Sequence, residues 1–364
     1  MIIHSDCYYF RGDVPCRPHK QHGVHCDGCT YYRPVTHKIL IIKLAAIGDV
    51  IRTTPLISAI REAYPNSLIY WITHTVDILP GSVDIKMDFS AMNVLALEET
   101  HFDLAMNLDK DREACALLNR VSATKKKGFI LKNGKPAPID KDAEHKFSTG
   151  IFDDISKANT KSYPEEIFEV AGFKFSGQPY ELENSGADKT VWPVDRKKIV
   201  VGLNTGCGGR WPSRLWPDDY WQAFTSGLIK SNYDVVLLGG EQEHERNKAL
   251  SQTTGAKYFG HFPLKKFIDL IDQCDIVVTQ VTMAMHLAIG RKKRLILMNN
   301  IFNRHEFELY GLGEIIEPSS GCDCYYLANC KREAEGRVPC MRDILPGDIL
   351  SAVQRQATFT EKAK

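Results

Sequence analysis

Apolar and polar positions follow the same pattern twice along this chain. In the first half, uninterrupted apolar runs at 37–44, 67–73 and 102–108 alternate with helical periodicity at 49–63 and 112–121. Apolar runs rich in β-branched residues are typical of strands buried on both faces of a parallel sheet. Strands that alternate with helices in this way predict βαβ units.

The pattern stops and then restarts. Residues from about 132 to 196 are polar and irregular, with one predicted helix at 163–172, and we interpret them as a junction. The second half begins with a predicted strand at 196–204. Its further predicted strands are 233–240, 275–280 and 293–300, and its predicted helices are 217–230, 241–252, 264–274, 281–291 and 344–358. The fold class is therefore α/β, with two Rossmann-like doubly wound domains. Ligands of such sheets bind at the carboxyl ends of strands, so we expect the two domains to face a cleft.

This reading divides the chain into five parts. They are a Cys-rich segment at 1–36, a Rossmann-like domain at 37–195, a second Rossmann-like domain at 196–318, a Cys-rich finger at 319–343, and a helix with its tail at 344–364.

Composition narrows the class of protein. The net charge is +1, which argues against electrostatic binding of nucleic acid. No apolar run reaches the roughly 18 to 20 residues that span a bilayer, and the first residues lack the features of a signal peptide. We expect a cytoplasmic protein with at most peripheral contact to the inner face of the inner membrane. The sequence leaves open whether the chain forms a homo-oligomer.

The 11 cysteines are clustered at the two ends of the chain. In a reducing compartment, clustered cysteines are more often metal ligands than disulfides. The predicted structural Zn or Fe ligands are Cys7, Cys16, Cys26, Cys29, Cys322, Cys324, Cys330 and Cys340. The C-x-x-C pair at 26–29 is the stronger signal, with His19, His22 and His25 as alternative ligands, and four thiolates favour a closed structural site.

One glycine-rich loop has the chemistry of a diphosphate site. The sequence NTGCGGRWPSR at 204–214 joins a predicted strand to a helix. Its candidate ligand-binding residues are Thr205, Gly206, Arg210 and Arg214, because backbone N–H groups and guanidinium forks suit a diphosphate. After the next strand, Glu241 stands where an acid often binds ribose hydroxyls.

Two other strand-to-helix junctions hold candidate residues. Thr282 and His286 open a helix after the strand at 275–280. In the first domain, Gly48 and Asp49 occupy the junction where two or three glycines normally admit a phosphate. Gly48 gives the backbone conformational freedom there and exposes the carboxylate of Asp49. The simpler explanation for an acid at position 49 is that it caps the helix.

Together these stretches resemble the ADP-heptose heptosyltransferases, glycosyltransferase family 9, over about residues 37 to 355. The resemblance rests on IIKLAAIGDVIRTTPLISAIREAYP at 41–65, RLWP at 214–217, GGEQE at 239–243 and VTMAMHLA at 281–288. It implies a GT-B fold, with 37–195 as the acceptor domain and 196–318 as the nucleotide-sugar donor domain, and an inverting transfer of heptose from ADP-heptose without a catalytic metal. The implied acceptor is a hydroxyl of the lipopolysaccharide core or of a protein Ser or Thr.

The resemblance also implies roles for single residues. Asp49 matches the general base, Arg214 the contact to the donor diphosphate, and Glu241 the acid that holds the adenosine. Thr282 and His286 match a second phosphate motif, in which Val281 and Met283 replace the family's acid and glycine. The clustered cysteines are similar in kind to the four-cysteine iron finger of the protein-modifying autotransporter heptosyltransferases.

Two other function classes compete with a transferase. A non-catalytic nucleotide-sugar or partner-binding module with metal-stapled ends is compatible with the altered motif at 281–286, although the presence of Asp49 argues against it. A nicotinamide-dependent oxidoreductase would need a G-x-G-x-x-G after its first strand, and LAAIGD at 44–49 does not supply one.

Overall fold

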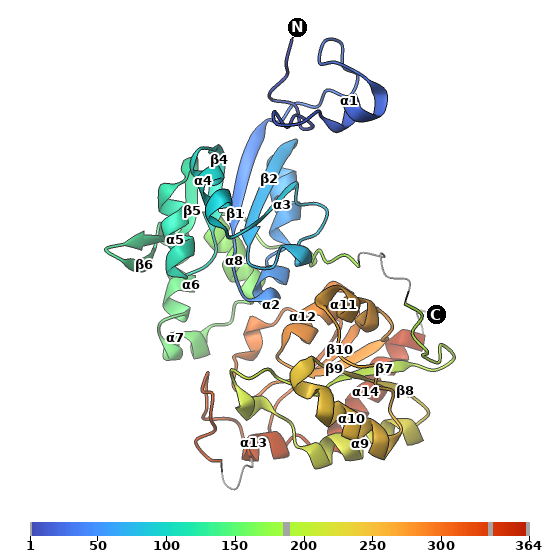
Figure 1. Cartoon of the computed structure of the whole chain (residues 1–364). Coiled ribbons are helices and arrows are strands. Elements are labelled where there is room, and N and C mark those ends of the chain that lie inside the picture. Colours follow the sequence, from blue (N-terminus) through green and yellow to red (C-terminus); the bar gives the residue numbers. More distant parts are fainter. Residues whose placement is uncertain (1, 185–189, 334–337, 362–364) are drawn as a thin grey trace. The chain divides into compact units, whose positions relative to one another are not determined.

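The computed structural model of the chain divides by backbone contacts into two compact units (Figure 1). It describes residues 2–184, 190–333 and 338–361. Unit 1 comprises 1–46, 53–147 and 165–178, and unit 2 comprises 47–52, 148–164 and 179–364. The units therefore interleave along the sequence, and the short segment 47–52, which holds Gly48 and Asp49, packs as part of unit 2.

Unit 1 is built on a mostly parallel sheet of strand order β3-β2-β1-β4-β5-β6. Its strands are β1 (His37–Ile42), β2 (Ser67–Thr73), β3 (Ile85–Asp88), β4 (His101–Asn107), β5 (Ser122–Lys132) and β6 (Lys135–Pro138). Its helices are α3 (Leu56–Ala63), α4 (Ala91–Glu98), α5 (Arg112–Arg120), α6 (Lys141–Thr149) and α8 (Tyr163–Ala171), of which α8 begins in unit 2. The central strand β1 is fully buried from Ile39 to Ile42, as expected of a parallel strand covered on both faces.

Unit 2 has an all-parallel sheet of strand order β11-β10-β9-β7-β8. Its strands are β7 (Val200–Asn204), β8 (Asp234–Leu238), β9 (Ile276–Gln280), β10 (Arg294–Met298) and β11 (Gly313–Ile316). Its helices include α9 (Asp218–Lys230), α10 (His244–Thr254), α11 (Leu264–Asp272), α12 (Met283–Gly290) and α14 (Pro346–Glu361). Both sheets thus have the predicted doubly wound α/β character.

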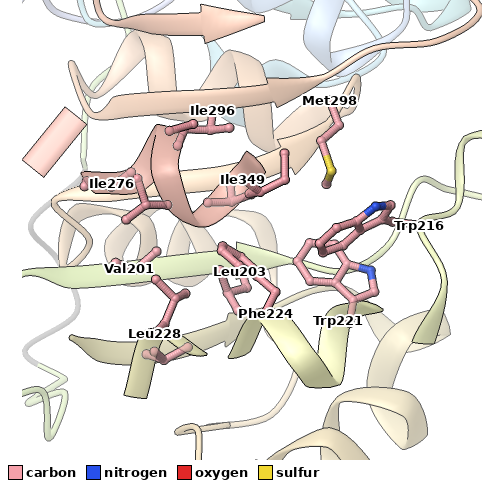
Figure 2. Packing of buried hydrophobic residues seen from close by; sticks show 14 of the residues in the cluster. Val201, Leu203, Trp216, Trp221, Phe224, Leu228, Ile276, Ile296, Met298 and Ile349 are labelled. Carbon is pink, nitrogen blue, oxygen red and sulfur yellow. The ribbon is translucent and has the colours of Figure 1, made fainter. Parts of the chain in front are cut away.

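An aromatic layer closes the core of unit 2 beside β7. Trp216 and Trp221 meet edge to face with ring centroids 4.9 Å apart, and Phe224 packs against both (Figure 2). Ile349 of α14 belongs to the same cluster, so the C-terminal helix completes this core. Edge-to-face pairs of this kind add about 0.5–1.5 kcal/mol each beyond area burial. This layer anchors the loop after β7, which contains the glycine-rich sequence.

The two Cys-rich segments contain little regular structure. The first holds only α1 (Arg17–His22) within its described part, residues 2–36, and the second holds α13 (Pro339–Arg342). Residues 334–337 of the predicted finger, 362–364 of the predicted tail and 185–189 of the predicted junction lie outside the described residues.

Two predictions about local structure were wrong. The helix expected at 49–63 is two helices, α2 (Ile47–Ile51) and α3, separated by a turn at 52–55. Pro55 explains the break, because it lacks an N–H and disfavours helical conformation in the residue before it. The stretch expected to be irregular contains β6, α6 and α7 (Asp153–Ala158). Within the described ranges, no helix combines the length and the apolar character needed to cross a bilayer.

Candidate active site

Asp49 lies on the short helix α2 and forms an ion pair with Arg52 one turn later. The Arg52 Nε donates to Asp49 Oδ1 over 2.9 Å, and Arg52 Nη2 lies 2.8 Å from the same oxygen. The Asp49 side chain remains 34% exposed, whereas that of Arg52 is 11% exposed. The carboxylate is therefore accessible to a ligand while its partner is held inside the protein.

Arg52 is fixed from two further sides. Its Nη1 donates to Glu306 Oε1 over 2.8 Å, and its guanidinium carbon lies 3.5 Å from the centre of the Tyr163 ring. The Tyr326 hydroxyl donates to the other Glu306 oxygen over 2.7 Å. Burial by itself would lower the pKa of Arg52, but the carboxylates of Asp49 and Glu306 outweigh it and hold that pKa well above its usual range. The guanidinium is therefore charged, and it is held by Asp49, Glu306 and Tyr163.

His286 packs directly against the glycine that precedes Asp49. A side chain at Gly48 would place its Cβ 2.5 Å from His286 Cδ2, so only glycine fits at that position. His286 is 7% exposed, and in the described part of the chain its Nδ1 has no hydrogen-bond partner. Burial, followed by the charge of Arg52, lowers the pKa of His286 to about 3. The imidazole is therefore neutral at physiological pH.

The carboxyl ends of β7 and β9 meet in a small hydrogen-bond cluster. Asn204 Nδ2 donates to Gly206 O over 3.0 Å, to Thr279 Oγ1 over 3.0 Å and to Thr282 Oγ1 over 3.3 Å. Thr282 is also the N-cap of α12, since its hydroxyl accepts from Ala284 N over 3.2 Å. Asn204 thereby ties the glycine-rich loop to the start of the helix that carries His286.

The two arginines of the glycine-rich loop have different environments. Arg214 is 5% exposed and donates to the backbone carbonyls of Cys207, Val281 and Trp211. Burial lowers the pKa of Arg214. Arg210, by contrast, is exposed and lies over the ring of Trp211, with 4.3 Å between the guanidinium carbon and the ring centre. The buried arginine holds the loop together, and the exposed one is able to reach a ligand.

The remaining residues predicted around this loop also divide into buried and exposed ones. Thr205 is fully buried and donates to Asn247 Oδ1 over 2.6 Å, which makes its hydroxyl part of the framework. Glu241 is exposed at the start of a short 3₁₀ turn after β8. Glu243, two residues on, accepts from Gly240 N over 2.9 Å and occupies the space that a side chain at Gly206 would need. Gly206 is thus required for close packing against Glu243.

A sequence model of glycosyltransferase family 9 (heptosyltransferase) matches residues 94–299, more than half of the chain. This chain belongs to glycosyltransferase family 9. It is therefore a glycosyltransferase, as predicted, and the matched range contains the glycine-rich loop, Glu241, Thr282 and His286. Asp49 and both cysteine clusters lie outside that range.

Individual relatives agree with this assignment. The chain is 20% identical over 297 residues to lipopolysaccharide heptosyltransferase 2 of Salmonella typhimurium, covering 72% of this chain and 82% of the relative. Among solved structures, ADP-heptose lipopolysaccharide heptosyltransferase II of E. coli matches with a TM-score of 0.63 and 16% identity, covering 89% of this chain and 99% of that one. The dodecameric iron-containing heptosyltransferase TibC of enterotoxigenic E. coli, in complex with ADP-D-β-D-heptose, matches with a TM-score of 0.58 and 12% identity, covering 89% and 76%. These likenesses confirm the GT-B type of fold.

In this family 9 chain the C-terminal cysteines gather in two pairs. The sulfurs of Cys324 and Cys330 lie 3.7 Å apart, and those of Cys340 and Cys322 lie 3.9 Å apart. The N-terminal cysteines all line one cavity of about 280 Å³. As the side chains stand, no three Cys, His, Asp or Glu residues in the described ranges form a group able to hold a metal ion.

Sequence reasoning missed three residues of this candidate site. They are Arg52, Asn204 and Glu306. The ion pair of Arg52 with Asp49 was predictable from the sequence, because a basic residue three positions after an acid on a helix is a common ion-pair partner. Glu306 had no such signal, since it lies 254 residues from Arg52.

Proposed function

We propose that this enzyme transfers heptose from ADP-heptose to an acceptor hydroxyl with inversion, and that Asp49 is the general base. One observation carries the proposal. Gly48 packs on His286, and Thr282, one helical turn before His286, is bonded to the glycine-rich loop through Asn204. One turn of α12 rises about 5.4 Å. An accessible carboxylate and a candidate phosphate loop are therefore linked through a single rigid helix.

The chemistry assigns a distinct task to each side of this arrangement. The acceptor oxygen attacks the anomeric carbon and forms the new C–O bond, while its proton passes to the Asp49 carboxylate. The bond between that carbon and the diphosphate oxygen breaks, and ADP departs with the electron pair. Base assistance is worth about 10²–10⁴-fold, and preorganised donors at the leaving group usually contribute the largest share.

On the donor side, we propose that Arg210 and the N–H groups of the glycine-rich loop and of the start of α12 hold the diphosphate. Helix N-termini and guanidinium groups suit this charge, so the chain itself supplies the cations and no catalytic metal is needed. Arg214 acts as a positioning residue, because its guanidinium is engaged by loop carbonyls. The exposed Glu241 receives the adenosine ribose, as in other Rossmann-like units.

We further propose that the four C-terminal cysteines hold one structural iron or zinc ion. Two thiolates of a tetrahedral site with metal–sulfur bonds of about 2.3 Å lie about 3.8 Å apart. The Cys324–Cys330 and Cys322–Cys340 sulfur separations of 3.7 and 3.9 Å bracket that value. TibC, which its structures describe as iron-containing, has a comparable fold, and this supports a metal at the cluster.

The test is incubation of the purified protein with ADP-heptose and cell-envelope fractions, with mass shifts read separately on lipopolysaccharide and on protein. Lipopolysaccharide is supported as acceptor by the Salmonella relative's name, and protein by the resemblance of the cysteines to the autotransporter branch. We expect Asp49→Asn to reduce turnover 100-fold or more with unchanged donor affinity. Asp348→Asn is the matched control, because Asp348 is also an acid in the first turn of a helix and is exposed.

Two results would reject the proposal. Binding of ADP-heptose without transfer to either acceptor class would favour a non-catalytic binding module. Turnover by Asp49→Asn close to that of the wild type would remove Asp49 from the base role. Reactions repeated in EDTA, expected to proceed at the same rate, test the absence of a catalytic metal.

A further inference from the structure

The N-terminal segment, residues 2–36, folds without a hydrophobic core of its own. Of these residues, all of which the structure describes, only Pro18 is buried. Apolar side chains such as Ile3 and Val14 remain 63% and 51% exposed. Segments shorter than about 40 residues rarely fold on apolar burial alone and need a disulfide, a metal or a partner surface. Something other than apolar packing must hold this segment in shape.

Backbone turns present its four thiols to one cavity. Cys26 and Cys29 flank a turn closed by a 3.2 Å bond from Cys29 N to Cys26 O, and Gly28 provides the left-handed φ of +68° that the turn requires. Cys16 is the N-cap of α1. Cys7 sits between two turns, with Cys7 N bonded to His4 O and Phe10 N bonded to Cys7 O.

The cavity itself is small and its lining includes four sulfurs. It has a volume of about 280 Å³, and its wall includes Cys7, Cys16, Cys26 and Cys29. His4, His19 and His25 also border it, and His19 Nδ1 is bonded to the carbonyl of Val24 at 2.9 Å. Thiols are the more numerous soft donors, and four thiolates complete a tetrahedral zinc site without an open position.

We propose that Cys7, Cys16, Cys26 and Cys29 bind one thiophilic divalent cation of the Zn²⁺ class, and that this ion replaces the missing core of residues 2–36. Binding closes the cavity, since the sulfurs must approach to about 2.3 Å from the ion. Folding and metal binding are then one process, as in other small metal-dependent modules. This site shares no residue with the proposed C-terminal cluster.

The ion would also order the attachment of the segment to the rest of unit 1. Tyr8, next to Cys7, donates to Asp84 Oδ1 over 2.8 Å, and the Arg33 guanidinium lies 4.4 Å from the centre of the Tyr8 ring. Asp84 in turn accepts from Arg61 Nη2 over 2.7 Å. Fixing Cys7 therefore fixes the position of Tyr8 against the strand end at Asp84.

The experiment measures metal content per chain of the full-length protein after exposure to Zn²⁺ and removal of free ion. We expect Cys26→Ser/Cys29→Ser to hold one Zn²⁺ fewer than the wild type, and to be cleaved faster by protease within residues 2–36. His22→Asn is the control, because His22 stacks on Tyr31 and does not line the cavity. In a Cys324→Ser/Cys330→Ser variant the C-terminal cluster is disrupted, so the metal content per chain reports the N-terminal site alone.

The outcomes are distinct. If the C-terminal cluster binds no metal, the wild type holds a single ion and Cys26→Ser/Cys29→Ser holds none, so the N-terminal inference survives failure of the C-terminal proposal. Equal zinc content in the wild type and Cys26→Ser/Cys29→Ser would overturn it. If that variant does not fold, Cys16→Ser and titration of the wild type with a zinc chelator give the same reading: unchanged protease sensitivity of residues 2–36 after zinc removal would contradict the proposal.

Discussion

Arg52 grips Asp49 with two nitrogens, Nε at 2.9 Å and Nη2 at 2.8 Å, while its third nitrogen holds Glu306 at 2.8 Å. The guanidinium thus couples the candidate base to a residue 254 positions away. Two nitrogens of one planar group fix the position of this carboxylate oxygen, which the point charge of a lysine does not do.

From this geometry we expect Arg52→Lys to lower kcat about 10- to 100-fold, because small displacements of a reacting group are costly. Donor KM should change little, since Arg52 does not belong to the glycine-rich loop. Steady-state kinetics with ADP-heptose check both values. Arg61→Lys is the control, since it alters a comparable ion pair with Asp84 in unit 1 and should leave kcat unchanged. Equal rates for Arg52→Lys and the wild type would contradict a positioning role.

Gly48→Ala should destabilise the enzyme through His286. The new methyl group would stand 2.5 Å from His286 Cδ2, and overpacking of this kind costs about 1–3 kcal/mol. Because the clash has a single named partner, Gly48→Ala/His286→Ala should be more stable than the sum of the single changes predicts. Chemical denaturation of the wild type, both single variants and the double variant gives this coupling. If the losses in the free energy of unfolding are additive, the side chain at position 48 does not clash with His286.

The sequence was sufficient for the doubly wound character of both units but not for all of their elements, since the strands β3, β5 and β11 were not predicted. Buried β-branched runs such as Ile39–Ile42 and the glycine-rich loop carry local signals, and both were found. The hairpin of β5 and β6 also has a local signal in the sequence, because Asn133 and Gly134 take the left-handed conformations that a tight hairpin turn requires. Two prolines in β6 concealed it, since proline is tolerated only at edge strands.

The candidate site was predictable only where its residues are neighbours in sequence. Gly48, Asp49, Thr282 and His286 stand at strand-to-helix junctions, and a Rossmann-like pattern directs attention to such positions. The packing of segment 47–52 with unit 2, and the contact of Arg52 with Glu306, depend on tertiary structure. No periodicity or motif encodes a pairing across 254 residues.

The buried imidazole of His286 predicts a pH dependence of stability. Its pKa is lowered from 6.5 to about 3 by burial and by Arg52, with Asp49 and Glu306 acting in the opposite direction. The unfolded chain therefore takes up a proton between these values and the folded chain does not, so stability falls as pH falls from about 6.5 towards 3. One such group contributes a slope of about 1.4 kcal/mol per pH unit within that window.

The measurement is the free energy of unfolding between pH 7 and pH 5, where most carboxyl groups remain ionised. His286→Asn should show a shallower dependence than the wild type, whatever its absolute stability. His101→Asn is the control, since His101 is exposed and should keep the wild-type slope. Parallel curves for the wild type and His286→Asn would contradict a neutral buried imidazole.

Loss of the metal proposed at the C-terminal cluster should destabilise unit 2. Cys324 and Cys330 belong to a buried cluster with Phe302, against which Trp211 packs, so an ion there would support the loop that holds Arg210 and Arg214. We expect Cys324→Ser/Cys330→Ser to lose one metal ion per chain and to melt several degrees lower, since about 1 kcal/mol corresponds to 2–4 °C in a domain of this size. Cys274→Ala is the control: burial raises the pKa of this thiol to about 12, and it lies outside both cysteine clusters. Identical metal content in the double variant and the wild type would exclude a metal at this cluster.

Substitutions of Arg210 and Arg214 should differ in their effects on the KM for ADP-heptose and on stability. Arg210 is exposed, so Arg210→Ala should raise the KM for ADP-heptose with little change in melting temperature. Arg214 is buried and donates to the carbonyls of Cys207 and Val281, so Arg214→Ala leaves buried acceptors unpaired and should cost about 1–3 kcal/mol of stability in addition to donor affinity. Melting curves and donor kinetics on both variants distinguish the two roles. A raised KM for Arg214→Ala at unchanged melting temperature would mean that Arg214 itself contacts the diphosphate.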